Sequence, residues 1–87
     1  MKFATTISYA DKPDTIAEVR PRHREYLTSL KESGKLWASG PFEDDSGALI
    51  IYEADSQADA EKMIADDPFN KAGVFQNITM KPWKQVF

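Results

Sequence analysis

Hydrophobic and polar residues alternate along the first segment of the chain. Phe3, Thr5, Ile7 and Tyr9 fall on one face of an extended chain, and the residues between them fall on the other. Such an alternation, rich in β-forming side chains, is typical of a strand that is buried on one side. The pattern therefore predicts a β-strand over residues 2–9.

A longer periodicity predicts a helical region next. Side chains suited to burial recur at three- and four-residue spacing, as on one stripe of an amphipathic helix; they are Ile16, Val19, His23, Tyr26, Leu27 and Leu30. Thr15 and Glu18 fit a capping box. Because Pro21 has no amide hydrogen and disfavours helical geometry at Arg20, we expect a short helical turn before Pro21 and the main helix from Pro21 onward. We expect Ser33-Gly34 to end this helix, since glycine often adopts the left-handed conformation there.

Three more strands are predicted in the rest of the chain. Residues 35–42 and 75–83 fit strands, and Pro82 near the end of the last one indicates an edge strand or a bend. Residues 48–54 are almost continuously apolar, which is typical of a central strand covered on both faces. Residues 43–47 are polar and predict a loop before this strand.

A second helix is predicted between the last two of these strands. Asp55 or Ser56 is a good N-cap for it. Because Pro68 disfavours helical geometry in the residue before it, we expect this helix to end near Asp66. A loop over residues 70–73 should follow.

The order β-α-β-β-α-β predicts an α+β fold of the ferredoxin-like class in one domain, residues 1–87. In it, four antiparallel strands carry two helices on one face. The other face would display apolar side chains such as Trp37, Trp83 and Phe87. A second copy of the sheet would cover this surface, so we expect a homodimer with face-to-face packing.

Composition excludes several classes of function. The chain has no cysteine and one histidine, so disulfides, thiolate catalysis, zinc-thiolate sites and centres with several histidine ligands are excluded. The pI of about 5.0 argues against nucleic-acid binding. No apolar run reaches the roughly 18 residues of a membrane span, and no signal-peptide pattern opens the chain. No glycine-rich phosphate loop is present. We expect a cytoplasmic protein without a cofactor or metal.

His23 and Asp67 are the strongest candidates for chemistry. Histidine titrates near neutral pH and is a natural general acid or base. His23 lies on the inward stripe of the first helix, where a hydrogen-bonded core histidine is as good an interpretation as a catalytic one. Asp67 closes the inward stripe of the second helix, where an Asp before Pro is often only a turn residue. Because both helices pack on the same sheet face, the two side chains can meet, and the carboxylate would then orient the imidazole.

Three further residues are candidates for ligand binding. Arg20 lies among the basic residues around His23, where Arg22 and Arg24 fit a solvated helix face or a patch that attracts a small anion. Ser39 and Gly40 end the second strand, as a simple bend or as a place where backbone and hydroxyl approach a ligand.

Short motifs along the whole chain resemble the YciI-like (YCII-related) family. They are Val19-Arg20-Pro21-Arg22-His23, Gly34-Lys35-Leu36, Ser39-Gly40-Pro41, Asp66-Asp67-Pro68-Phe69, Ala72-Gly73-Val74, Lys81-Pro82-Trp83-Lys84 and Val86-Phe87. The resemblance implies a ferredoxin-like fold of the dimeric α+β barrel superfamily. It also implies a pocket with a conserved His and Asp, here His23 and Asp67, lined by Arg20 and the Ser39-Gly40 segment.

The leading hypothesis is therefore a small cofactor-independent enzyme of the lyase or isomerase type. His23 would transfer a proton, Asp67 would orient it, and Arg20 would anchor a small anionic cyclic or aromatic substrate. The alternatives are a domain of the same fold that binds a metabolite or partner without turnover, and a purely structural domain in which His23 is a satisfied core group.

Overall fold

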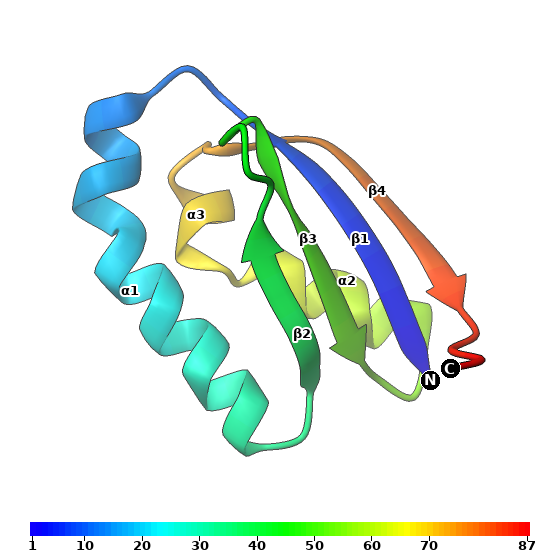
Figure 1. Ribbon diagram of the computed structural model, residues 1–87. Helices are drawn as coiled ribbons and strands as arrows, with labels where there is room; N and C mark the ends of the chain where they lie inside the picture. The colour runs from blue at the N-terminus through cyan, green and yellow to red at the C-terminus, as the bar shows by residue number, and fades with distance from the viewer.

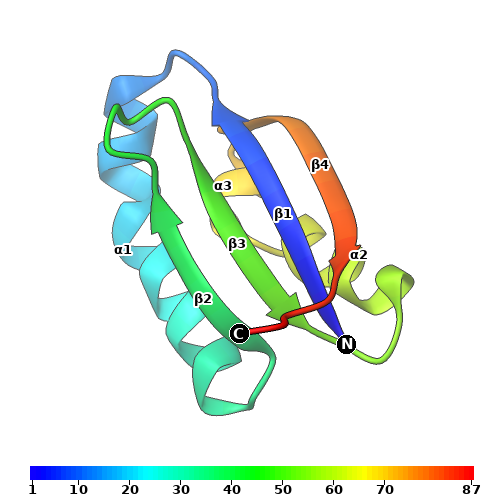
Figure 2. The same ribbon diagram turned by 45° about the vertical axis from the view of Figure 1, so that its right-hand side comes forward.

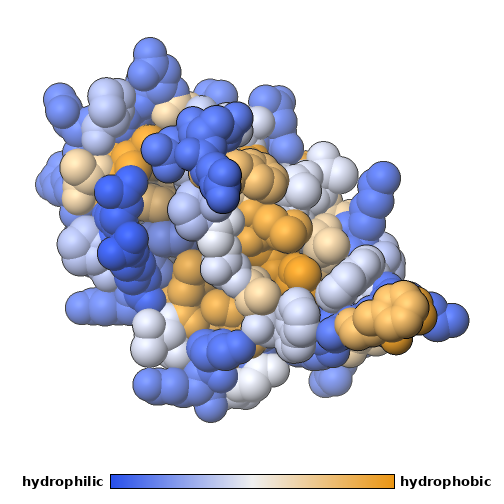
Figure 3. All heavy atoms as spheres, in the orientation of Figure 1, coloured by the Kyte–Doolittle hydropathy of each residue, from blue (hydrophilic) through white to orange (hydrophobic).

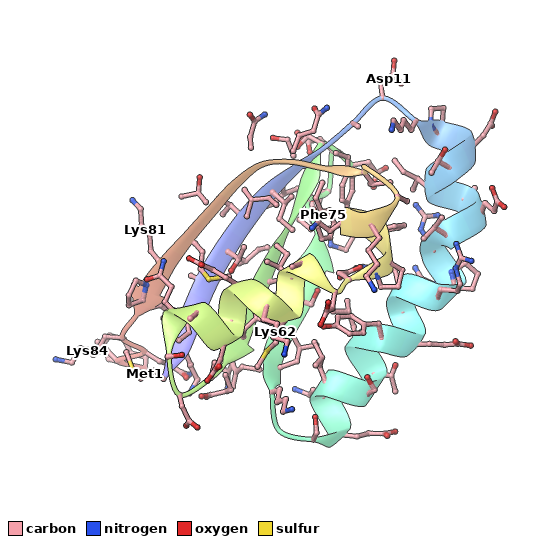
Figure 4. All side chains as sticks on the ribbon, turned by 180° about the vertical axis from the view of Figure 1, so that it is seen from behind. Met1, Asp11, Lys62, Phe75, Lys81 and Lys84 are labelled. Carbon is pink, nitrogen blue, oxygen red and sulfur yellow. The ribbon has the colours of Figure 1, made fainter.

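The four strands form one antiparallel sheet. The computed structural model describes residues 1–87. In chain order the elements are β1 (Lys2–Tyr9), α1 (Pro13–Glu32), β2 (Leu36–Pro41), β3 (Gly47–Glu53), α2 (Gln57–Ala65), α3 (Pro68–Lys71) and β4 (Phe75–Trp83). The strand order is β2-β3-β1-β4, and all helices lie on one face (Figures 1 and 4). The predicted ferredoxin-like fold is confirmed, and β4 lies at an edge as Pro82 indicated.

Strand register determines which side chains face the helices. Phe3, Thr5 and Ile7 of β1 stand opposite Tyr52, Ile50 and Ala48 of β3, and all six are buried. The helices pack on this face of the sheet and contribute the rest of this core, with Val19, Leu30, Ala60, Ile64 and Phe69. The predicted stripes of both main helices thus meet the alternating face of β1.

A bulge in β4 changes which of its residues face the helices. Ser8 pairs with Gln76 and Thr6 with Thr79, so β4 contains one residue more than β1 between these pairs. Asn77 adopts the left-handed conformation there, with φ of 50°, which Asn tolerates better than most residues. As a result, residue 75 before the bulge and residue 80 after it both lie on the helix side, although a regular strand would place them on opposite faces.

Helix α1 differs from the prediction. It runs without interruption from Pro13 to Glu32 and contains Pro21, so the expected separate turn and the start at Pro21 are wrong. Its N-cap is Lys12 and no side chain caps it, so the expected capping box at Thr15 is wrong as well. Pro21 and Ala17, whose carbonyl loses its helical partner, both lie on the exposed side. Water can therefore satisfy this carbonyl while the opposite side of the helix stays packed.

The predicted end of α1 and both predicted ends of α2 are confirmed. Gly34 follows α1 with φ of 77°. The Ser56 hydroxyl caps α2 by accepting from the Asp59 amide at 3.1 Å, and α2 ends with Asp66 as its C-cap. The expected loop over residues 70–73 is wrong at its start, because the short helix α3 occupies Pro68–Lys71.

The face opposite the helices remains largely uncovered. Leu49 on β3 is 37% exposed, so the expectation that this strand is covered on both faces is wrong for the single chain. Trp37 and Trp83 are 40% and 39% exposed and lie side by side, with ring centroids 5.9 Å apart. Figure 3 shows hydrophobic side chains over the middle of this face, and Figure 2 shows the C-terminal segment passing in front of it. None of the helices is both long and apolar enough to cross a membrane.

Candidate active site

The structure brings His23 and Asp67 into direct contact. His23 lies in the middle of α1, and Asp67 lies at the junction between α2 and α3. The distance between His23 Nδ1 and Asp67 Oδ1 is 2.7 Å. Asp67 is fully buried, and the side chain of His23 is 12% exposed. Two residues separated by 44 positions in the chain are therefore joined beneath the surface, with the imidazole between the carboxylate and solvent.

Asp67 also serves the backbone. The same Oδ1 accepts a hydrogen bond from the Phe69 amide at 2.9 Å, and Asp67 is the N-cap of α3. Pro68 occupies the first helical position, where its missing amide hydrogen costs nothing. The turn interpretation of Asp67 is thus correct, and it coexists with the contact to His23.

The hydrogen bond determines which nitrogen of His23 carries the hydrogen. An ionised carboxylate only accepts hydrogen bonds, so Nδ1 carries a hydrogen when it bonds to Asp67. In the neutral imidazole, Nε2 is then the unprotonated nitrogen and is able to take a proton. The contact can therefore orient a base in the way that the sequence analysis expects.

Aromatic rings surround the imidazole. His23 stacks on Phe69 with ring centroids 4.0 Å apart, and Phe75 approaches edge-on at 6.0 Å. Tyr9 contacts the same two phenylalanines, at 6.1 Å from Phe69 and 6.4 Å from Phe75. These rings come from β1, α3 and β4. No pattern in the sequence marks Tyr9, Phe69 or Phe75 as a site residue, although the Asp66-Asp67-Pro68-Phe69 motif contains one of them.

Three buried side-chain oxygen atoms, one of them on Asp67, have no hydrogen-bond partner in the chain. They are Asp67 Oδ2, the Tyr52 hydroxyl and Thr5 Oγ1. Burial raises the pKa of Tyr52, and the charges of Asp67 and Tyr26 raise it further. Burial and the charges of Asp66 and Asp67 raise the pKa of Tyr26 to about 12. The charge of the buried Asp67 carboxylate thus raises the pKa of a tyrosine on α1 and of another on β3.

Arg20 lies on the same helix as His23. It precedes His23 by almost one helical turn, is exposed, and forms no ion pair. Burial raises the pKa of Tyr9, the positive charge of Arg20 lowers it, and the charges of Asp45 and Asp67 raise it. Arg20 therefore supplies an unpaired positive charge near the aromatic cluster.

Ser39 and Gly40 lie on β2. They line a shallow hollow of about 260 Å³ on β2, together with Phe42 and Leu49. No hydrogen bond joins Ser39 to His23 or Asp67. Their assignment to the same pocket stays a prediction.

A hollow of about 640 Å³ lies next to the site and does not include His23 or Asp67. It is an open groove between α1 and α2, with Met1 and Lys62 on its lining and Tyr26 at its boundary with the core. In Figure 4, Lys62 marks this groove, whereas Phe75 marks the aromatic cluster near α3. No group of three or more His, Cys, Asp or Glu side chains is placed to hold a metal ion.

Comparison with known proteins determines the family. The model of the YCII-related domain matches residues 1–84. The chain belongs to the YCII-related family. Protein YciI of a strain of Escherichia coli is 33% identical to this YCII-related chain, over 88% of the chain and 92% of the relative. The uncharacterized protein YjpA of Bacillus subtilis is 36% identical, over 71% and 72%.

Solved structures resemble the YCII-related chain over nearly its full length. One is 5-chloro-2-hydroxyhydroquinone dehydrochlorinase (TftG) from Burkholderia phenoliruptrix, in complex with 2,5-dihydroxybenzoquinone. It has a TM-score of 0.84 and 28% identity, and the match covers 97% of this chain and 94% of that one. An antibiotic biosynthesis monooxygenase has a TM-score of 0.62 at 19% identity, covers 99% of each chain, and shares the fold.

Proposed function

We propose that this chain is a small enzyme that moves a proton on an anionic cyclic or aromatic compound. His23 acts as the general base or acid, Asp67 orients it, and Arg20 binds the negative charge of the substrate. The chemistry is an isomerisation or an elimination. In the first, the proton returns to another atom of the substrate. In the second, a leaving group departs with the electron pair and the proton passes to water.

The observation that carries this proposal is the 2.7 Å contact between His23 Nδ1 and Asp67 Oδ1. A carboxylate in this position holds the imidazole in one tautomer and stabilises the imidazolium that forms when Nε2 takes a proton. Asp67 is itself held by the Phe69 amide, and Phe69 covers one face of the ring. An imidazole fixed in this way has little freedom to reorient during a reaction.

The nature of the substrate is inferred from charge and from the structural relative. Arg20 provides an unpaired cation at the site, which favours a ligand with an ionised oxygen. TftG, which acts on a chlorinated hydroxyhydroquinone, was crystallised with a dihydroxybenzoquinone. Oxygen-bearing rings of this class are thus the first compounds to test with this chain.

Turnover of 5-chloro-2-hydroxyhydroquinone, followed by chloride release, tests the proposal with purified protein. His23→Asn and Asp67→Asn should each lower the rate by about 10²–10⁴-fold, since they remove the proton acceptor or the group that orients it. Arg22→Gln is the matched control on the exposed side of α1 and should leave the rate unchanged.

Three other outcomes would contradict parts of this scheme. A rate within threefold of wild type for His23→Asn would remove His23 from the mechanism. Ligand binding without turnover of any compound in this class would favour the metabolite-binding alternative. If no compound binds and His23→Leu unfolds at the same or a higher urea concentration than wild type, the pair is structural, because replacing a buried polar group by an apolar one is often neutral or stabilising.

We also propose that the protein works as a homodimer. The exposed apolar side chains of Trp37, Leu49, Ile78 and Trp83 belong to strands of the sheet, which helices cover on one face only. Sheets pack face to face by burying such surfaces, and a second copy supplies a matching one.

A further inference from the structure

We propose that Tyr9 is a ligand-binding residue of the His23 site, and that its hydroxyl and Arg20 hold the same ionised oxygen of the substrate. This inference rests on the proposed function and extends it. It names a second recognition group and predicts that the ligand presents a phenolate or hydroxyquinone oxygen between the two side chains.

The position of Tyr9 is determined by contacts on several sides. It is the last residue of β1, and its amide donates to the Ser46 carbonyl at 2.9 Å. The next amide, of Ala10, donates to the Val74 carbonyl at 2.8 Å. The Tyr9 ring also contacts Phe69 and Phe75, the two rings that surround His23. Both backbone and ring therefore hold Tyr9 at the edge of the site.

The hydroxyl of Tyr9 differs from those of the other two tyrosines. The Tyr26 hydroxyl donates to the Met63 carbonyl at 2.6 Å, so its hydrogen is not free to bond to a ligand. Tyr52 is fully buried, so its hydroxyl is out of reach of a ligand that enters from solvent. Tyr9 is half-buried, and its hydroxyl donates to no group of the chain. It is the one tyrosine hydroxyl that is both accessible and free to bond.

The charges around Tyr9 favour a donor role. Burial, together with the carboxylates of Asp45 and Asp67, raises its pKa, although Arg20 opposes them. The hydroxyl therefore stays protonated at neutral pH and can donate to an anionic oxygen. Hydrogen bonds to charged groups are about twice as strong as those between neutral groups.

The same groups define the ligand class. Arg20 offers planar, charge-bearing donors, and Tyr9 offers one neutral donor on a rigid ring. An oxygen that receives both carries negative charge and lies next to an aromatic wall. Phenolates and hydroxyquinones meet this description, whereas a neutral hydrocarbon or an amine does not.

Binding of 2,5-dihydroxybenzoquinone to wild type and variants, measured by its absorbance change, tests the inference. Tyr9→Phe keeps the ring contacts and removes only the hydroxyl, so affinity should fall by about tenfold to a hundredfold. Tyr26→Phe is the matched control and should bind within twofold of wild type. If Tyr9 and Arg20 hold one oxygen, Tyr9→Phe combined with Arg20→Gln should lose less affinity than the product of the two single losses.

The outcomes separate this inference from the proposed function. Wild-type binding that Tyr9→Phe leaves within twofold overturns the role of Tyr9 and leaves the proposed function standing. Losses that multiply in the double variant show that Tyr9 and Arg20 act on different atoms, which overturns the shared-oxygen arrangement. If the quinone neither binds to wild type nor shifts the His23 imidazole resonances in an NMR titration, both proposals are overturned.

Discussion

At the residue scale, Asp67 combines structure and candidate chemistry on one atom. Its Oδ1 accepts from both the Phe69 amide and the His23 imidazole. The first bond begins α3 and the second orients the imidazole, so the local turn delivers the carboxylate to α1. This explains how a residue that begins one helix can also position a side chain of another. The turn role of Asp67 and its proposed site role rest on the same geometry.

Gly47 offers a test of backbone packing at the residue scale. A Cβ at this position would lie 1.8 Å from the Ile7 carbonyl oxygen and 2.9 Å from its carbon, and neither backbone atom can move aside easily. Gly47→Ala should therefore lower the free energy of unfolding by about 2 kcal/mol or more. Gly40→Ala is the control, because a Cβ there meets open space, and it should change stability by less than about 0.5 kcal/mol. Urea unfolding measures both, and equal effects would contradict this explanation.

The raised pKa of Tyr26 predicts a loss of stability in alkaline solution. Tyr26 has a pKa of about 12 in the folded protein and 10.0 as its ordinary value, because burial and the charges of Asp66 and Asp67 disfavour its ionised form. Between these pH values the folded state binds more protons than the unfolded state, so stability falls as pH rises from about 10 to 12 and is unaffected by this group below 10. The urea midpoint should decrease over this range, and less so in Tyr26→Phe. A Tyr26→Phe profile parallel to that of wild type would contradict this assignment.

At the element scale, α1 shows how packing overrides a local signal. Pro21 disfavours the helix around it, yet Val19 and His23 on the inner side stay packed against the core across this point. The cost falls on the outer side, where water replaces the missing bond. Pro21 therefore does not determine where the helix begins, and His23 is presented from the middle of a continuous helix.

Replacing Pro21 should stabilise the protein. Proline is about 3 kcal/mol less favourable than alanine inside a helix, while its restriction of the unfolded chain returns up to about 1 kcal/mol. Pro21→Ala should therefore raise the free energy of unfolding by about 2 kcal/mol in urea unfolding experiments. Arg22→Ala, next to it on the exposed side, should change stability by less than about 0.5 kcal/mol. A destabilised Pro21→Ala would show that the helix relies on the proline.

At the scale of the whole molecule, the two faces of the sheet differ in what covers them. Helices cover one face, whereas the other exposes Trp37, Leu49 and Trp83 in the single chain. Small domains often gain stability by burying such a surface against a second copy. The fold therefore supplies a reason for association that is independent of the candidate site.

Sedimentation measures this association directly. At micromolar concentration the 9.8 kDa chain should sediment with the mass of two copies. Leu49→Lys places a charge in the middle of the open face and should shift the protein toward the monomer. Ala58→Lys adds the same charge on an exposed position of α2 and should leave the dimer intact. A wild-type monomer at this concentration, or equal dissociation of both variants, would contradict the proposed interface.

Local patterns in the sequence were enough to predict the strands, most helix ends and the inward direction of His23. Alternation and three-to-four periodicity reflect which side of an element is buried, and the order of the elements then restricts the topology to few choices. The strand β1 and the strand β4 were predicted with their observed bounds. The expected meeting of His23 and Asp67 followed from placing two inward stripes on one sheet face, although which nitrogen and which oxygen are in contact did not.

Only the tertiary structure decided the rest. The continuity of α1 through Pro21 depends on packing energy on its inner side, which no local pattern records. The bulge at Asn77, which places Phe75 on the helix side, depends on pairing with a strand nearly 70 residues away in the chain. Tyr9, Phe69 and Phe75 gather around His23 for the same reason, since distances between distant segments arise when strands pair and helices dock. A sequence determines which faces are buried, and the packing of those faces determines which atoms meet.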